Sequence, residues 1–519
     1  MLVASNTVTS QWSIGSQSTT DRPTLQMVLT PFAVYGNAFD VRFGSIAAIV
    51  GKALGTAPSA FHTYATWPLL VEAYSALAFT NNSKLSVELK RLVAIVSSLV
   101  AQCAYCSALA CGLGDVFNGA VQVTQPLKLS STDLSPNDRK AIRLIVAATK
   151  VPARVTPEMQ LNVHQAFAGK AELQDLAQAF ATGGFLNTLN SLLACELDEP
   201  VAATATEAFK GSLFSFGPHK FLARMKSNPF RKIIDVIQLA QEAKAVSQAT
   251  EVFLSGVPTS NSALDEFLEN LLGFQPRYLK KITNIGLKRV YCTLFSKLVF
   301  WTDEDDDIAS GTFDGIYQPD LPFTDRLVIC YVYFMGASNH LLALHFAYVA
   351  IVRFGVDPSE LELSLMAAQD FNHKSDKSVH NPLEIMAALS YYSARRYHRR
   401  MWRLAPKLYS ATENPATVMA FVSLTSFLTL LQRFSAVVDD GKGLEPEVLD
   451  FLKTSDAKSI GLHTLTHSSN SFDFDASPEE LEIEWDDIDI DTISVAAASL
   501  RMSVRQLTAG QVWGGGAEY

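Results

Sequence analysis

The sequence predicts an all-α protein made of two similar helical domains. Apolar residues recur at helical spacing in five windows along the chain, and no run alternates in the way that predicts an exposed strand or a hairpin. Three short segments recur in the same order in the second half, which indicates an internal duplication. The helical windows are Leu85–Val100, Asp138–Ala148, Leu173–Cys195, Phe230–Val252 and Val418–Val438.

The duplication rests on segment pairs whose order and spacing are similar in the two halves. The second copy is longer between its first two segments, and the extra residues, 302–322, are rich in acids, Gly and Pro, which predicts an exposed loop. The first pair is Leu54-Gly55-x-x-Pro58 with Leu272-Gly273-x-x-Pro276. The second is Arg91-Leu92-Val93 and the CxxC region Cys103–Ala110 with Arg326-Leu327-Val328 and Ser338–His345. The third is Phe180–Leu186 with Phe421–Leu428.

The chain of 519 residues is too long for one hydrophobic core and fits two or three domains. We expect five segments, each with its own composition. They are a flexible leader (1–40), a first domain (41–203), a polar helical connector (204–260), a second domain (261–440) and an acidic tail (441–519).

Composition narrows the function classes. The chain is 48% hydrophobic and only 18% charged, which favours large buried helix or subunit interfaces and a homo-oligomer. Ten acids and no base lie in Asp473–Asp491, within a net charge of -10, so the rest is nearly neutral and a general nucleic-acid-binding surface is not expected. The acidic, apolar segment 472–493 is either a solubilising tail or a recognition segment for a protein partner or neighbouring subunit.

The densest basic run is Arg395–Arg403, which contains Tyr397 and Trp402. Interleaved aromatic residues permit a nucleic-acid interpretation. A solvated or interface helix face fits the net charge better. On one continuous helix Arg396, Arg399, Arg400 and Arg403 would share that face and could dock the acidic tail.

A charge-free run, Leu327–Val352, is long enough to span a bilayer. Its centre is polar around Gly336, so we expect two buried core helices joined there rather than a membrane span. The N-terminus lacks the pattern of a secretory signal, and six cysteines are too few for a disulfide scaffold. Both observations predict the cytoplasm or another reducing compartment.

The residues best suited to chemistry are Cys103-Ala-Tyr-Cys106. Cysteines at i and i+3 face the same way on a helix and can form a disulfide. Their thiolates are favoured at a helix N-terminus and in CxxC motifs. Two alternatives are a pair of small buried apolar residues and a zinc site. The zinc site lacks further ligands near by, because His463-x-x-x-His467 lies far along the chain.

The pattern around these cysteines resembles the carboxymuconolactone decarboxylase and alkyl hydroperoxidase D (AhpD) family, in which an Arg-Glu-Leu helix precedes CxxCxxxH. The likeness covers about residues 45–200 and, in weaker form, 265–440, and the tandem arrangement resembles that of sestrins. The matching segments are Lys90-Arg91-Leu92, Cys103-Ala-Tyr-Cys106-Ser-Ala-Leu-Ala110, Leu134-Ser-Pro-Asn-Asp138-Arg139 and Phe185-Leu-Asn-Thr-Leu-Asn190.

The resemblance implies an all-α fold that associates into oligomers and needs no cofactor. It implies that Cys106 attacks a peroxide and that Cys103 resolves the product, with a thiol as reductant. The chain departs from the family at two proton-handling positions, where Arg91 replaces the Glu and Ala110 replaces the His. Arginine cannot accept a proton, so Arg91 can supply only positive charge. Support for the dithiol is expected from Arg91 and Tyr105, and activity is expected to be weak or limited to disulfide exchange.

The second copy has the complementary loss. Ser338 and Leu341 stand at the cysteine positions, Arg326 at the Glu position and His345 at the His position. Ser338, His340, His345 and Arg326 therefore form a candidate second pocket, although a satisfied core histidine is the simpler interpretation of His345.

Three functions follow as alternatives: a weak AhpD-like peroxide or disulfide reductase, a catalytically retired fold that serves binding or assembly, and a decarboxylase- or isomerase-like enzyme that uses His345.

Overall fold

The computed structural model describes most of the chain between residues 59 and 467. The ranges are 12–14, 25, 29, 59–64, 67–79, 84–101, 103, 105–106, 135–151, 153–195, 214–216, 251, 253–301, 319–371, 381–396, 398–439 and 443–467. The leader beyond its strand, the loop at 302–318, most of the connector and the acidic segment 472–493 lie outside these residues.

The described part is helical apart from one short strand pair, which confirms the all-α prediction. The pair joins β1 (Trp12–Ile14) in the expected leader to β2 (Phe214–Phe216) in the expected connector, in parallel. The first half holds α4 (Ser59–Tyr64), α5 (Pro68–Phe79), α6 (Val87–Val100), α8 (Pro136–Thr149), α9 (Pro157–Ala166) and α10 (Lys170–Leu193).

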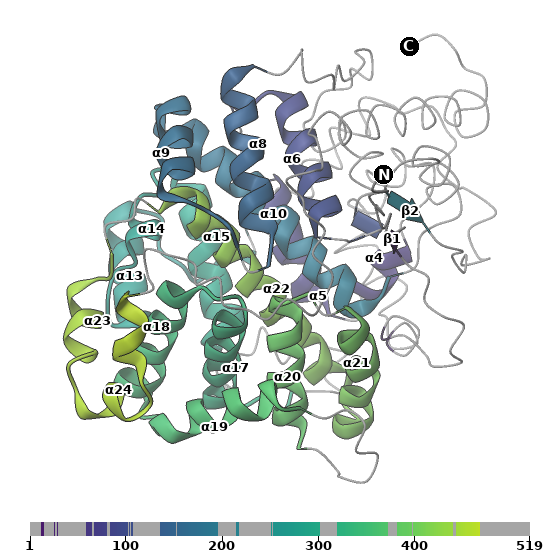
Figure 1. The fold of residues 1–519 in the computed structure, drawn as a ribbon, viewed down its shortest axis with the longest axis vertical. Coiled ribbons are helices and arrows are strands. Elements are labelled where there is room, and N and C mark those ends of the chain that lie inside the picture. Colours follow the sequence, from purple (N-terminus) through teal and green to yellow (C-terminus); the bar gives the residue numbers. More distant parts are fainter. Residues whose placement is uncertain are drawn as a thin grey trace, which may run out of the picture.

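The second half also contains one long helix, α22, together with shorter ones (Figure 1). It holds α13 (Asn261–Leu272), α14 (Arg277–Lys280), α15 (Ile285–Leu294), η4 (Phe295–Val299), α17 (Phe323–Gly336), α18 (His340–Tyr348), η6 (Val349–Arg353), α19 (Pro358–Gln369), α20 (Pro382–Ala394), α21 (His398–Thr412), α22 (Pro415–Val438), α23 (Pro446–Phe451), α24 (Ser455–Ser459) and η7 (Leu462–His467).

Many of these helices begin with the same sequence signal, a polar N-cap residue followed by proline. The cap side chain accepts a hydrogen bond from a backbone N–H of the first turn, and proline at the first position lacks an N–H that would need a partner. The pairs are Ser135-Pro136, Thr156-Pro157, Asp357-Pro358, Asn381-Pro382 and Asn414-Pro415.

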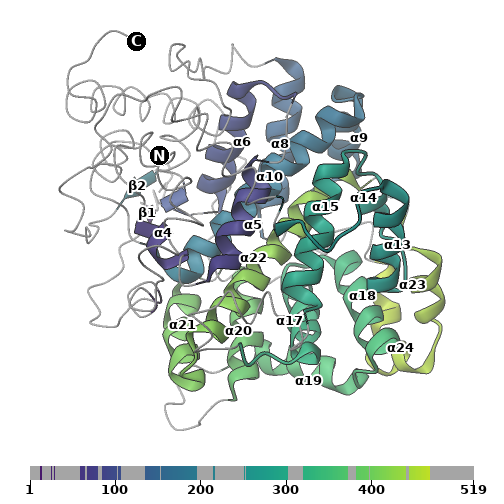
Figure 2. The same cartoon turned by 180° about the vertical axis from the view of Figure 1, so that it is seen from behind.

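The two longest helices, α10 and α22, pack against each other and join the two halves (Figures 1 and 2). They run antiparallel, because Gly184 faces Arg433 and Thr188, further along α10, meets Thr429, earlier in α22. The Oγ1 atoms of Thr188 and Thr429 are 2.7 Å apart. Both helices are lined by fully buried apolar residues, so the centre of the core lies along this pair.

Two adjacent glycines allow α10 to be approached closely from two sides. A Cβ on Gly183 would lie 3.0 Å from Ser97 Oγ of α6, and one on Gly184 would lie 2.5 Å from Arg433 Cδ of α22. Any larger residue would therefore push α6 or the Arg433 side chain away.

We expect Gly184→Ala to destabilise the fold by about 1–3 kcal/mol, the usual effect of overpacking. The added methyl would also meet Thr429 Cγ2 at 3.2 Å, so both neighbours must move. Urea unfolding measures the effect. Gly169→Ala is the control, since its nearest contact would be at 3.7 Å. Equal stability of the two variants would contradict the packing described here.

Polar side chains also link the halves. Gln174 Nε2 donates to Lys281 O (2.8 Å), and Gln174 Oε1 accepts from Thr283 N (3.1 Å). Tyr291 OH donates to Gln178 Oε1 at 3.2 Å. His164 of the first half also contacts the end of α22, with its Nε2 atom 2.8 Å from Val437 O. The halves therefore form one packed body.

The charge-free run Leu327–Val352 folds as expected, with α17 ending at Gly336 and α18 starting at His340. A Cβ on Gly336 would lie 3.0 Å from Tyr391, so glycine lets α17 and α20 touch. Among the described residues, α22 is long and apolar enough to cross a membrane, but it is almost completely buried inside the protein.

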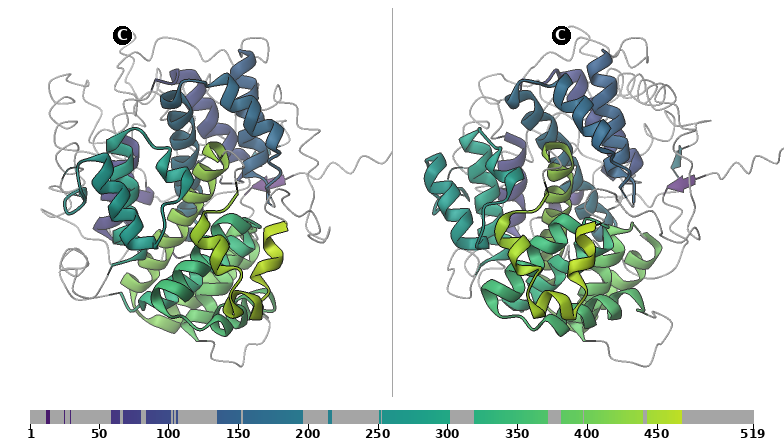
Figure 3. Two further views of the ribbon diagram at one scale, coloured as in Figure 1. Left: turned by 90° about the vertical axis from the view of Figure 1, so that its left-hand side faces the viewer. Right: turned by 60° about the vertical axis from the view of Figure 1, so that its left-hand side comes forward.

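The expected tail from residue 441 is folded over its first part. Leu444, Val448, Phe451 and Leu462 are buried and pack α23, α24 and η7 onto the second half, beside α18 (Figure 3). The folded part of the second half therefore extends to at least His467, because these apolar side chains pack into its core.

The basic run Arg395–Arg403 is not one helix. α20 ends at Ala394, and Arg396 takes a left-handed backbone with φ 55° before α21 begins. The break turns Arg396 inward, whereas Arg400 lies over the Tyr392 ring, 5.1 Å from its centroid. The expected shared face of Arg396 and Arg400 is therefore wrong.

Candidate thiol redox centre

The two cysteines of the CxxC motif are joined in a disulfide directly after α6, with their Cα atoms 5.3 Å apart. Both are buried, with exposed fractions of 4% for Cys103 and 6% for Cys106. The backbone holds them together: Cys103 N donates to Ser98 O at 3.0 Å, and Cys106 N points at Cys103 Sγ at 3.2 Å. The CxxC spacing therefore forms the disulfide that the sequence predicts as feasible.

Asn190, in the last turns of α10, is a polar residue that faces the sulfur of Cys106. Its Nδ2 donates to Cys106 Sγ at 3.4 Å. Its Oδ1 accepts a short hydrogen bond of 2.5 Å from Tyr64 OH of α4. With the amide oxygen toward the tyrosine hydroxyl, the NH₂ group of Asn190 faces the sulfur. Leu186 O lies 3.5 Å from the same sulfur, in position to accept an S–H.

Tyr105, predicted to support the dithiol, is buried and accepts a hydrogen bond of 3.4 Å from Ala60 N. It therefore ties the CxxC turn to α4, the same helix that supplies Tyr64. A second amide, Asn187, accepts from Ser98 Oγ at 3.0 Å and donates to Ser97 O at 3.3 Å, which fixes the end of α6 to α10.

The sequence pattern did not single out Asn190 or Tyr64 as site residues. They are 126 positions apart in the chain and meet only because α4 and α10 pack together. The backbone of Arg91 lies within α6, while its side chain and the whole of Ala110 lie outside the described part of the chain. Their predicted influence on the dithiol stays a prediction.

Two other cysteines have an environment that suppresses reactivity. Burial, only partly offset by Lys288, raises the pKa of Cys292 to about 12. Burial likewise raises the pKa of Cys330 well above its ordinary value, against a smaller opposite effect of Arg326. Within the described residues, no group of three or more His, Cys, Asp or Glu could hold a metal ion.

In the second half, the residues that replace the motif have different surroundings. Arg326 is buried, stacks over the Trp301 ring at 3.9 Å and donates to Trp301 O at 2.6 Å. Ser338 is partly exposed and has a positive φ of 54° at the turn before α18. His340 is partly exposed at the start of α18. The cavity beside the α10–α22 pair is lined by none of the four residues of the predicted second pocket.

His345 lies buried in α18 and bonds Glu445, whose Oε2 is 2.7 Å from His345 Nε2. The ring packs against Phe274 and stacks on Tyr278. Glu445 Oε1 also accepts from Arg277 N at 2.7 Å. The histidine thus joins α18, α14 and the segment after α22, which is a packing role.

The Glu445 contact makes a pH prediction. Burial alone would raise the pKa of Glu445, but His345 and the N–H of Arg277 outweigh burial and hold the pKa below its ordinary value of 4.5. A lowered carboxyl pKa stabilises the fold above the unfolded-state value, and this stabilisation is lost as the pH falls through the folded-state value.

We therefore expect stability to drop on acidification below about pH 4.5, and to drop less in Glu445→Gln, which cannot titrate there. Urea unfolding at pH 6 and in steps below pH 4.5 measures the difference between the two proteins. A difference that stays constant across this series would contradict the assignment.

No protein-family model, curated protein or solved structure matches this chain.

Proposed function

We propose that the chain is a duplicated AhpD-like protein whose first half reduces peroxides or disulfides through Cys103 and Cys106. The observation that carries the proposal is the sulfur of Cys106, which lies within bonding distance of Cys103 and accepts an N–H from Asn190. A donor held against the sulfur favours the thiolate, which is the nucleophilic form.

The reaction balances without a cofactor. The Cys106 thiolate attacks the terminal peroxide oxygen, the O–O bond breaks, and the alkoxide leaves as an alcohol after taking a proton. The resulting sulfenic acid reacts with the Cys103 thiol, releases water and forms the disulfide. An external thiol reductant then restores the dithiol by exchange, which places the protein in a reducing compartment.

Tyr64 and Asn190 supply the polar contacts to the sulfur in a site that lacks the Glu and His of the family pattern. The buried Tyr64 hydroxyl is linked to the sulfur through one amide, so the pair can orient and stabilise charge at Cys106. Asn190 itself cannot act as a base. General-base help contributes roughly 10²- to 10⁴-fold, and without it turnover is expected to be slow.

The duplication is supported by the contact between α10 and α22. Thr188 stands three residues after Phe185 and Thr429 two residues after Phe427, so the two threonines lie within one position of equivalence in the third repeated segment pair. These two threonines touch each other in an antiparallel pair. Residues at equivalent positions meet in this way beside a two-fold axis, so the halves would pack as two subunits of a dimer do.

The decisive experiment measures the dithiol and its turnover together. Thiol titration of the reduced and oxidised protein, the reduction potential of Cys103/Cys106, and consumption of an organic hydroperoxide with dithiothreitol as donor are compared for the wild type and Cys106→Ser. We expect one reversible disulfide and turnover that Cys106→Ser abolishes.

Cys292→Ser is the matched control, because the Cys292 thiol is buried and its pKa is raised to about 12. It should keep the turnover of the wild type. Turnover that is equal in the wild type and Cys106→Ser would overturn the proposal.

A second candidate is a non-catalytic binding or assembly protein. The burial of both sulfurs, at 4% and 6% exposure, favours it, because a peroxide must reach Cys106. In that case the disulfide forms and is reduced in the titration, but the rate of its oxidation by hydroperoxide equals that of a small dithiol at the same pH.

A further inference from the structure

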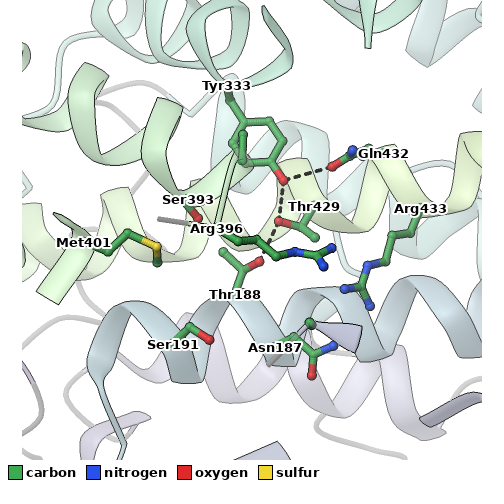
Figure 4. A pocket seen from close by; sticks show the side chains of 12 residues that line it. Asn187, Thr188, Ser191, Tyr333, Ser393, Arg396, Met401, Thr429, Gln432 and Arg433 are labelled. Atoms are coloured by element: carbon green, nitrogen blue, oxygen red, sulfur yellow. Dashed lines mark hydrogen bonds between the residues drawn. The ribbon is translucent and has the colours of Figure 1, made fainter. Parts of the chain in front are cut away.

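A small cavity lies between the two halves, beside the α10–α22 pair (Figure 4). It has about 20 Å³ of room for the centre of a water-sized sphere, which exceeds the roughly 10–15 Å³ that one water needs. Polar groups from both halves line it, among them Asn187, Thr188 and Ser191 of α10, Tyr333 of α17, and Arg396 and Arg433.

Arg433 points into this cavity from α22 and has no hydrogen-bonding partner for its Nη1 atom. The side chain is only 2% exposed, and its guanidinium lies over the Phe180 ring at 4.9 Å. Gly184 leaves the space that the Arg433 chain crosses. An aromatic face compensates part of the charge of a cation, but it does not satisfy the N–H donors.

Arg396 reaches the same cavity from the break between α20 and α21. One of its nitrogens, Nη1, donates to Val100 O at the end of α6, at 3.0 Å. Figure 4 shows the two guanidinium groups turned toward the same space. Burial, and to a lesser degree the nearby Arg396 charge, lowers the pKa of Arg433 well below its usual range. A buried cation and a partly buried one thus disfavour each other's charged form.

The remaining polar groups offer no negative charge in compensation. No Asp or Glu occurs among the described residues that line the cavity. Tyr333 OH, Thr429 Oγ1 and Thr188 Oγ1 are joined at 2.7 Å each, and Tyr333 OH also donates to Gln432 Oε1. Hydroxyl groups are thereby held in a fixed chain beside the guanidinium groups.

We propose that this cavity binds a small oxyanion, a carboxylate or a phosphate group, between Arg396 and Arg433. Breaking a buried charge pair by leaving one partner unpaired is strongly destabilising, and a bound anion removes that cost. The planar guanidinium of arginine donates two parallel hydrogen bonds to a pair of carboxylate or phosphate oxygens. A spherical ion such as chloride cannot accept this pair of hydrogen bonds in the same way. The volume of about 20 Å³ holds one or two oxygen-sized groups, so it takes the oxygens at the edge of the charged group that face the two arginines.

The site is separate from the thiol centre. The cavity is lined by Ala101 and by residues of α10, but neither cysteine lines it. An anion here would not touch sulfur, so the test of this site does not need Cys106 to turn over peroxide. Because the lining comes from both halves, the anion would hold them together.

The test is thermal unfolding of the full chain in titrations of sodium formate, sodium phosphate and sodium chloride at constant ionic strength, followed by calorimetric titration with the anion that acts. We expect a saturable rise in Tm with formate or phosphate, and none with chloride beyond the matched ionic-strength effect. Formate alone assigns a carboxylate ligand and phosphate alone a phosphate group, and either supports the site.

Arg433→Met keeps an unbranched side chain over Phe180 but removes the charge, and Arg396→Met is the second variant. Each should weaken binding by at least about tenfold, since a charge-assisted hydrogen bond is lost. Arg433→Met should also be at least as stable as the wild type in anion-free buffer, because it removes an unpaired buried charge. Arg143→Met is the control, since Arg143 is exposed on α8.

A saturable response in the wild type and Arg143→Met that is lost in both cavity variants supports the site. Phosphate also stabilises proteins generally by exclusion from their surface, but that effect is not saturable. A response of the same size and shape in all four proteins, or saturation with chloride alone, would overturn the proposal.

Discussion

Asn190→Leu is expected to slow the reaction of Cys106 with an organic hydroperoxide by about 10- to 100-fold, because a hydrogen bond to a charged group is worth about 1.5–3 kcal/mol. Leucine has a similar volume but offers no N–H to Cys106 Sγ. It also leaves the buried Tyr64 hydroxyl without its acceptor, Asn190 Oδ1. We expect the thiolate to become less favoured and the pH dependence of thiol alkylation at Cys106 to shift upward.

Asn187→Leu is the matched control for this effect. Asn187 lies one turn earlier in α10, is buried to the same degree and also makes two buried hydrogen bonds, but to Ser97 and Ser98 rather than to sulfur. Both variants should lose stability, by about 1–3 kcal/mol for each buried group left unsatisfied. Only Asn190→Leu should change alkylation at Cys106. Tyr64→Phe should give a smaller change in the same direction, because the amide stays but is no longer oriented.

The readout is the rate of alkylation and of hydroperoxide-driven disulfide formation as a function of pH, measured on the reduced protein. If both asparagine variants change these rates equally, the effect is a loss of packing and the role assigned to Asn190 is wrong.

Glu445→Leu is expected to destabilise the protein by about 2–5 kcal/mol, because two donors lose their acceptor and each buried polar group left unsatisfied costs about 1–3 kcal/mol. The change leaves the His345 ring without its Glu445 contact and also removes the acceptor of Arg277 N. Because Glu445 connects α14, α18 and the segment that follows α22, we expect α23 and α24 to separate from the second half at lower denaturant than the rest.

Glu447→Leu serves as its control, two residues further on and exposed. It should change stability by less than about 0.5 kcal/mol, as surface substitutions usually do. Urea unfolding followed by circular dichroism gives the stabilities, and hydrogen exchange locates the first helices to open. Equal stability of the two leucine variants would show that the His345–Glu445 pair contributes nothing.

Much of the helical architecture could be predicted from local sequence. The window Leu173–Cys195 lies over α10, and the window Val418–Val438 lies within α22, because a continuous apolar face over this length fixes both the type and the place of a helix. The CxxC spacing likewise predicted a feasible disulfide, since three residues along one turn already bring the sulfurs together.

What local patterns could not give are the partners of the functional side chains. Asn190 meets Tyr64 across 126 positions, and His345 meets Glu445 across 100, in a segment that composition had placed in an acidic tail. The helical periodicity of its charges predicts that the basic run Arg395–Arg403 is one solvated helix. The left-handed backbone of Arg396 breaks that helix and sends one of those charges inward, a tertiary effect that helical periodicity does not contain.

Helix α10 carries Asn190 to the sulfur and, on neighbouring turns, Asn187, Thr188 and Ser191 to the cavity. Two ligands that share one rigid element are subject to thermodynamic linkage. If reduction of the disulfide shifts α10, the affinity of the cavity for its oxyanion changes with it. Reciprocity then requires that the oxyanion change the reduction potential of Cys103/Cys106 by the same free energy. Through α10, the concentration of the oxyanion in the cell would then change the reduction potential of the dithiol.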